Sequence, residues 1–113
     1  MISANELAAA LQQCAARQRQ KETELQQQAR FDEAVHARIA RNVFDIFTAV
    51  LRAAAKQGSE EAALLFFKKK LAEIPAAWQA AQQKAAAAGD DSAVFTEQLK
   101  LDAAAEIEAL LLR

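Results

Sequence analysis

Asp32, Glu33 and His36 are the residues whose types and spacing come nearest to a metal site. A carboxylate one helical turn before an imidazole, the Glu-x-x-His pair, supplies part of the ligand set of a di-iron centre in ferritin-like bundles. Such a centre needs two pairs and further glutamates, whereas this chain has one histidine and therefore one pair. A second copy would have to supply the other pair. We expect no metal and no other cofactor, and interpret His36 as a solvated or salt-bridged side chain.

Nucleophilic catalysis would depend on Cys14, the only cysteine, which lies among alanine and glutamine and well before His36 in the sequence. A nucleophile needs a base and an orienting group beside it. The two glycines are too far apart to form a phosphate-binding loop, and no pair stands out among the 15 acidic residues. We therefore expect a protein without enzymatic activity. A single cysteine forms no internal disulfide, which fits a reducing, cytoplasmic compartment.

Lysines at three consecutive positions, Lys68, Lys69 and Lys70, follow the apolar run Leu64-Leu65-Phe66-Phe67. This candidate basic patch could contact an acidic partner or a membrane surface. The alternative, which we favour, is an apolar face turned to the core beside a solvated lysine flank. No uncharged apolar run is long enough to span a membrane. Residues 1–6 show no basic region followed by an apolar one, so we expect no signal peptide.

Positive charge is also spread over residues 17–41, where acidic residues interrupt it. The basic residues are Arg17, Arg19, Lys21, Arg30, Arg38 and Arg41. The formal net charge of the chain is -1, from 14 basic and 15 acidic residues. Proteins that bind nucleic acid by neutralising phosphates are usually far more basic, so nucleic-acid binding is not expected.

The composition favours helices, so helices must position these residues. Hydrophobic residues make up 53% of the chain, but about half of them are alanine, the best helix former. Glycine (2) and proline (1) are scarce, and no run alternates in β-branched and aromatic residues. We predict one all-α domain over residues 1–113, in which a long N-terminal helix packs with two or three shorter helices into a helical hairpin or bundle.

The long helix is predicted to begin after Ser3, which forms a capping box with Glu6, and to continue until Gly58. A helix over 4–57 would be about 80 Å long, far beyond the usual length, so a hidden kink or break is the alternative. From residue 31 onward an apolar stripe predicts a core-facing helix; it comprises Phe31, Val35, Ile39, Val43, Phe47 and Val50.

The segment 1–30 is too polar to cover a core, because Leu25 is the only large apolar residue between positions 17 and 28. We expect it to project from a core bundle formed by 31–113, or to dimerise. The candidate interface is a heptad-like, coiled-coil seam of Leu7, Leu11, Cys14, Gln18 and Leu25. Its polar members predict a weak homodimer. The alternative is a monomer in which this segment bends back over the bundle.

The remaining helices are marked by caps and breakers. Ser59 is a good N-cap, Pro75 predicts a break near Glu73-Ile74, and a turn at 89–92 precedes a last helix from about Ala93. The largest residues on the apolar faces should form the core: Phe44, Phe47, Leu64, Phe67, Leu71, Trp78, Phe95 and Leu99.

The string Ala29-Arg30-Phe31-Asp32, followed by Val35 and lying after a Gln/Arg-rich helix that contains Cys14, resembles the N-terminal part of the PriC family (primosomal replication protein N''). The resemblance covers residues 7–50. It implies an all-helical protein that helps to reload the replicative helicase at stalled forks. The chain departs from that family in being shorter and in lacking its strongly basic character. Our first hypothesis is therefore a non-enzymatic helical interaction module, a small bacterial adaptor or chaperone-like protein, and the second is an accessory protein of DNA replication restart.

Overall fold

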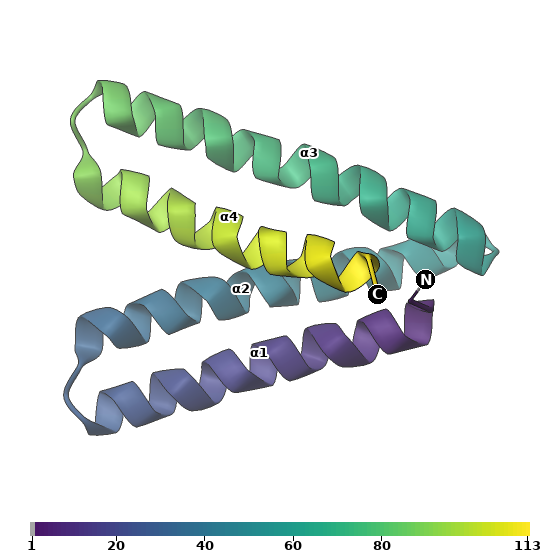
Figure 1. The fold of residues 1–113 in the computed structure, drawn as a ribbon, viewed down its shortest axis with the longest axis horizontal. Coiled ribbons are helices and arrows are strands. Elements are labelled where there is room, and N and C mark those ends of the chain that lie inside the picture. Colours follow the sequence, from purple (N-terminus) through teal and green to yellow (C-terminus); the bar gives the residue numbers. More distant parts are fainter. Residues whose placement is uncertain (1) are drawn as a thin grey trace.

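The computed structural model describes residues 2–113, which form four α-helices in two antiparallel hairpins (Figure 1). The helices are α1 (Ala4–Gln27), α2 (Phe31–Ala54), α3 (Glu60–Ala87) and α4 (Asp91–Leu111), with a short 3-10 turn, η1 (Ala55–Gln57), after α2. The hairpins α1–α2 and α3–α4 meet near the connection from α2 to α3 and diverge toward their tips. The prediction of an all-α bundle is confirmed.

The single long helix predicted over 4–57 is wrong, because α1 ends at Gln27 and the chain reverses. The N–H of Arg30 donates to the Leu25 carbonyl at 2.8 Å, and the N–H of Ala29 donates to the Gln26 carbonyl at 3.0 Å. Together these bonds form a Schellman motif, which ends a helix when its C′ residue takes a positive φ. That residue is Ala29, at φ 59. The longest extent of the molecule is 44 Å rather than about 80 Å.

The N-terminal segment is therefore part of the core and does not project. Leu7 and Leu11 are fully buried, and Cys14 and Leu25 are buried as well. The first three join the main core cluster, while Leu25 packs with small side chains of α2. The apolar residues of the predicted dimer seam therefore pack inside the chain. This agrees with the alternative in which the segment bends back over the bundle. Near the tip of the hairpin, where the segment is most polar, Leu25 alone meets the small side chains of Ala34 and Ala37.

The predicted break at Glu73-Ile74 is also wrong, since α3 continues from Glu60 to Ala87 with Pro75 inside it. Proline has no N–H to donate to the carbonyl four residues earlier, which weakens a helix at that point. Here Leu71 is buried on one side of Pro75, and Trp78 packs against the core on the other. We attribute the continuity of α3 to this packing on both sides of the proline.

The caps predicted at Ser3 and Ser59 are confirmed, whereas α4 begins at Asp91, two residues before its predicted start. Ser3 and Glu6 form both hydrogen bonds of a capping box, and the Ser59 hydroxyl accepts from the Ala62 N–H at 3.1 Å. In the α3–α4 turn, Asp90 accepts from the Ala93 N–H at 3.1 Å and caps α4. The caps fix where the helices start, and so fix which faces can meet.

The core lies where the two hairpins meet. Five of the predicted members are buried: Phe44, Phe47, Leu64, Phe67 and Leu71. The Trp78 ring is partly buried and lies edge-on to Phe47, with 6.4 Å between ring centroids. Leu99 is only half-buried. Phe95 is 50% exposed, so its prediction as a core residue is wrong. It lies near the start of α4, close to the tip of the second hairpin.

Candidate interaction surfaces

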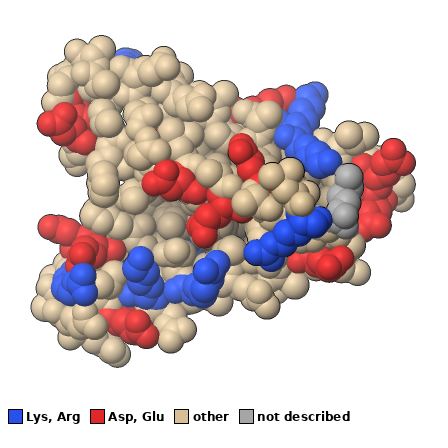
Figure 2. Space-filling view, in the orientation of Figure 1, with Lys and Arg blue, Asp and Glu red and all other residues tan. Residues whose placement is uncertain are grey.

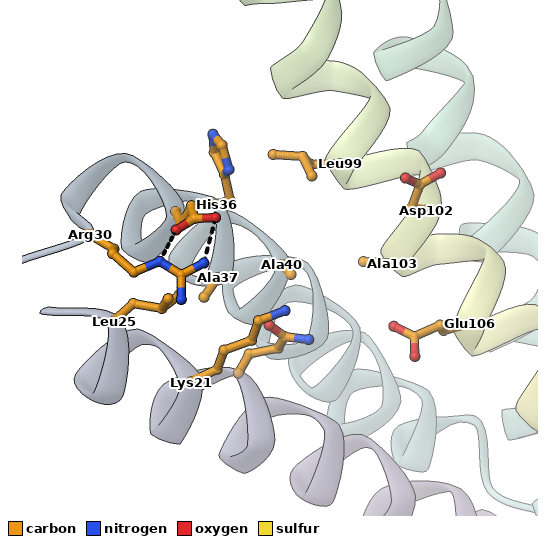
Figure 3. Close-up of a pocket in the computed structure, with 12 residues that line it drawn as sticks. Lys21, Leu25, Arg30, His36, Ala37, Ala40, Leu99, Asp102, Ala103 and Glu106 are labelled. Carbon is orange, nitrogen blue, oxygen red and sulfur yellow. Dashed lines mark hydrogen bonds and ion pairs between the residues drawn. The ribbon is translucent and has the colours of Figure 1, made fainter. Parts of the chain in front are cut away.

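A groove runs between α1 and α4 with α2 as its floor (Figure 3). It holds about 410 Å³ of open space. Gln18, Lys21 and Leu25 of α1 form one wall, and α2 contributes Glu33, His36, Ala37 and Ala40. The opposite wall consists of Leu99, Asp102, Ala103 and Glu106 of α4. We call this hollow the α1–α4 groove; of the predicted seam, only Gln18 and Leu25 reach it.

The two walls of the α1–α4 groove carry opposite charge. Lys21 and Arg30 lie on the side of the first hairpin, and Asp102 and Glu106 project from α4 (Figure 3). The space-filling view shows a row of basic side chains along the first hairpin, with acidic ones among them, and acidic side chains facing this row (Figure 2). An occupant of the groove would therefore meet positive charge on one edge and negative charge on the other.

Arg30 is partly neutralised within the chain. Its guanidinium forms a bidentate pair with Glu33, in which Nη2 donates to Oε1 at 2.8 Å. The hydrogen bond from Arg30 lowers the pKa of Glu33, and the same bond raises the pKa of Arg30. Both groups thus stay charged and bound to each other. Lys21 has no ion-pair partner among residues 2–113, so it supplies most of the free positive charge in the groove.

His36 does not take the solvated or salt-bridged position that its sequence suggested. It is half-buried, and its ring lies edge-on to Phe95 with the ring centroids 4.9 Å apart. This contact joins α2 to α4 at the end of the groove nearer the tips. Glu33, the carboxylate one turn earlier, is held by Arg30 instead. Across the described part of the chain, no three His, Cys, Asp or Glu side chains gather as metal ligands would.

The outer face of α2 is a second exposed surface. Phe31 is 62% exposed, and Val35 and Ile46 are each 41% exposed. The sequence predicted that Phe31 and Val35 would face the core, as Val43 and Phe47 do. Near its start, this face of α2 borders α4, where Val35 lines an open hollow with Phe95 and Thr96. Exposed apolar side chains that adjoin one another often mark a binding surface.

Two basic residues of α2, Arg38 and Arg41, are engaged with one carboxylate that sequence analysis missed. Glu22 of α1 is buried, and its side chain meets Arg41 at 2.8 Å and Arg38 at 3.2 Å. An acidic residue amid polar neighbours gives no sign of burial in the sequence. Because Arg30, Arg38 and Arg41 are all paired, this region offers less free positive charge than its composition indicates.

The candidate basic patch on α3 is mixed in character. Leu64 and Phe67 are buried, whereas Leu65 is 62% exposed. Lys69 and Lys70 both reach Glu73, at 3.9 and 3.4 Å, and the Lys70 ammonium lies 5.6 Å from the centre of the Phe66 ring. The burial of Leu64 and Phe67 agrees with the predicted core face beside a lysine flank. None of the helices formed by residues 2–113 is long and apolar enough to cross a membrane.

Comparisons with models of known protein families, with curated protein sequences and with solved structures gave no match to this chain.

Proposed function

We propose that this protein is a non-enzymatic helical interaction module and that the α1–α4 groove binds one amphipathic helix of a partner protein. The observation that carries the proposal is a groove between a basic and an acidic wall, whose lining includes the small apolar side chains of Ala37, Ala40 and Ala103.

The dimensions of the groove fit a short stretch of helix. Its walls extend from Gln18 to Leu25 on α1 and from Leu99 to Glu106 on α4. Seven residues of helix rise about 10 Å, so the groove accommodates about two turns of a partner. Ala37, Ala40 and Ala103 are small, which lets a helix backbone approach the floor closely. Contact over so short a length predicts binding in the micromolar range or weaker.

Charge defines the partner further. Its helix would place an apolar strip on the alanines, acidic residues toward Lys21 and Arg30, and basic residues toward α4. Exposed ion pairs each contribute little to affinity, but charges of the wrong sign oppose binding and so provide specificity. Reversing the direction of such a helix exchanges its two edges. The walls therefore also select the direction in which the helix binds.

The experiment uses three labelled helical peptides of about 18 residues with the same Ala/Leu strip. One carries Glu on one edge and Lys on the other, and the controls carry only Lys or only Glu. Fluorescence anisotropy should show the mixed peptide binding most tightly, with Lys21→Glu weakening it about two- to fivefold. Lys84→Glu is the matched control, because Lys84 is exposed on α3 and does not line the groove. It should leave binding unchanged.

A triple variant makes the test stricter. Lys21→Glu combined with Asp102→Lys and Glu106→Lys exchanges the charges of the two walls and should restore binding, with the peptide in the opposite direction. Paramagnetic relaxation from a spin label at one peptide end would report that direction. Equal affinity for the three peptides, or no binding at millimolar concentration, would overturn the proposal for this groove.

A second candidate function is an accessory role in DNA replication restart, as the resemblance to the PriC family implies. One observation favours it: the matching string Ala29-Arg30-Phe31-Asp32 forms the exposed tip of the first hairpin, accessible to a partner. Fluorescence anisotropy with labelled single-stranded DNA at physiological salt is the test. We expect no micromolar binding, because the nearby arginines are paired with acids. Micromolar binding that weakens steeply with added salt would favour this second function.

The proposal also includes a cytoplasmic location and weak self-association. The apolar residues of the seam first expected to mediate a dimer are buried inside the chain, and Gln18 lines the α1–α4 groove. Self-association therefore requires a different surface.

A further inference from the structure

The outer face of α2 is exposed along its whole length. Five positions point in nearly the same direction, since successive residues turn by about 100° around a helix: Phe31, Val35, Asn42, Ala49 and Ala53. All five are exposed. The face thus continues from Phe31 to Ala53, about 33 Å at the usual helical rise, with large apolar residues at one end and alanines at the other.

We infer that this face pairs with the same face of a second copy, with the two α2 helices antiparallel about a two-fold axis at Asn42. The inference rests on the self-association included in the proposed function and supplies its surface. A two-fold axis at Asn42 places Phe31 opposite the partner's Ala53 and Val35 opposite the partner's Ala49. Each large side chain then meets a small one, which lets the two helices pack closely over their full length.

Charge complementarity supports the same arrangement. Arg38 and Asp45 lie along one edge of the face, and both are exposed. In an antiparallel two-fold pair, like edges adjoin and run in opposite directions. Arg38 therefore lies beside the partner's Asp45, and Asp45 lies beside the partner's Arg38, so one contact type forms twice. Both side chains can still reach a partner, because Arg38 and Asp45 are 47% and 52% exposed despite their contacts to Glu22 and Arg41.

The other edge explains why the pair is antiparallel. Ile39 and Ile46 lie along it, with Ile46 41% exposed. The antiparallel arrangement brings Ile39 against the partner's Ile46. A parallel pair would bring opposite edges together and place the charges of Arg38 and Asp45 against isoleucines, without compensation. On the axis, Asn42 meets the partner's Asn42, and two amides can hydrogen-bond and fix the register, as a buried asparagine does in coiled coils.

Sedimentation equilibrium on the full chain tests the surface first. The wild type should form a dimer with a dissociation constant in the micromolar range. Val35→Glu should weaken it at least about tenfold, because it buries a charge without a partner. Leu65→Glu is the control: Leu65, like Val35, is an exposed apolar residue, but it lies on α3. It should leave the dimer unchanged, and circular dichroism should show that both variants fold.

Charge reversal provides a test that simple damage to the fold does not imitate. Arg38→Asp gives a copy with only acids on the edge, and Asp45→Arg gives a copy with only bases. Each alone should be monomeric, whereas an equimolar mixture should form a heterodimer with both contacts restored. A mixture no more associated than the separate variants would overturn the inference. A dimer whose affinity is unchanged by Val35→Glu would also overturn the inference about this face, but not the proposed self-association. A strictly monomeric wild type would overturn both the inference and the proposed self-association.

Discussion

Ala29 occupies the same place in the first hairpin that Gly89 occupies in the second. Both residues follow the end of a helix with a positive φ, 59 for Ala29 and 71 for Gly89. Their N–H groups donate to the carbonyls of Gln26 and Ala86, at 3.0 and 3.1 Å. In both hairpins the N–H of the next residue bonds another carbonyl of the last helical turn, at 2.8 and 2.9 Å. The same turn geometry thus closes both hairpins. The second hairpin has glycine, which suits a positive φ, at this position, and the first has alanine, which does not.

Ala29→Gly is therefore expected to stabilise the protein. The left-handed conformation costs an alanine about 1–2 kcal/mol that a glycine does not incur. The greater freedom of glycine in the unfolded chain offsets part of that gain. The net expectation is about 0.5–1 kcal/mol more stability, measured by urea denaturation as a higher midpoint with an unchanged slope.

Gly89→Ala is the reciprocal change and should destabilise the protein by about 1 kcal/mol. A Cβ at Gly89 would meet no atom within 4 Å, so the loss would come from backbone strain rather than from a clash. If Ala29→Gly instead lowered the midpoint as glycine does inside a helix, the first turn would not have the geometry described.

These turns explain how far the sequence predicts the fold. Ser3, Ser59 and Gly89 each carry a local signal, and the corresponding caps and turn were predicted correctly. Ala29 carries none, because alanine is the residue most typical of a continuing helix. The signals that remained were Asp32 and Glu33, two acids of the kind favoured in the first turn of a new helix.

The candidate surfaces depend on tertiary packing and were harder to predict. Lys21 and Glu106 face one groove but lie on the first and last helices, so no local pattern connects them. The apolar periodicity of α2 was visible, but periodicity does not show which side a neighbour will cover. Phe31 and Phe47 belong to the same predicted stripe, yet one is 62% exposed and the other is fully buried.

Phe47→Ala should cost about 3–5 kcal/mol, the usual loss for a fully buried phenylalanine. The Phe47 ring lies edge-on to Phe67 and Trp78, with centroids 5.9 and 6.4 Å away, so its removal leaves a cavity among aromatic side chains. Phe95→Ala is the matched control, because Phe95 is half exposed. Its cost should stay below about 1.5 kcal/mol. Similar losses from the two substitutions in chemical denaturation would contradict the placement of the core.

The capping box should make stability depend on acid. Its side-chain hydrogen bond with Ser3, and then the backbone one, lower the pKa of Glu6 in the folded chain. A carboxyl group with a lowered folded pKa stabilises the fold above its unfolded pKa of about 4.3, and that contribution is lost as the pH falls through the folded pKa. Glu6→Gln should therefore reduce the drop in melting temperature on acidification. An NMR titration that finds an ordinary Glu6 pKa would contradict the capping box.

Glu22→Gln should destabilise the fold by about 1.5–3 kcal/mol, the range for hydrogen bonds to charged groups. Glu22 is buried on α1 and joins α1 to α2 through Arg41 and Arg38, so its charge is held away from water between two arginines. The amide of glutamine keeps the size of the side chain but not its charge, and it leaves the guanidinium groups less well satisfied. Glu24→Gln, two residues later and exposed, is the matched control and should change stability by less than about 0.5 kcal/mol. Thermal and urea unfolding of both variants measure the difference, and equal stability of the two would show that Glu22 does not hold the first hairpin together.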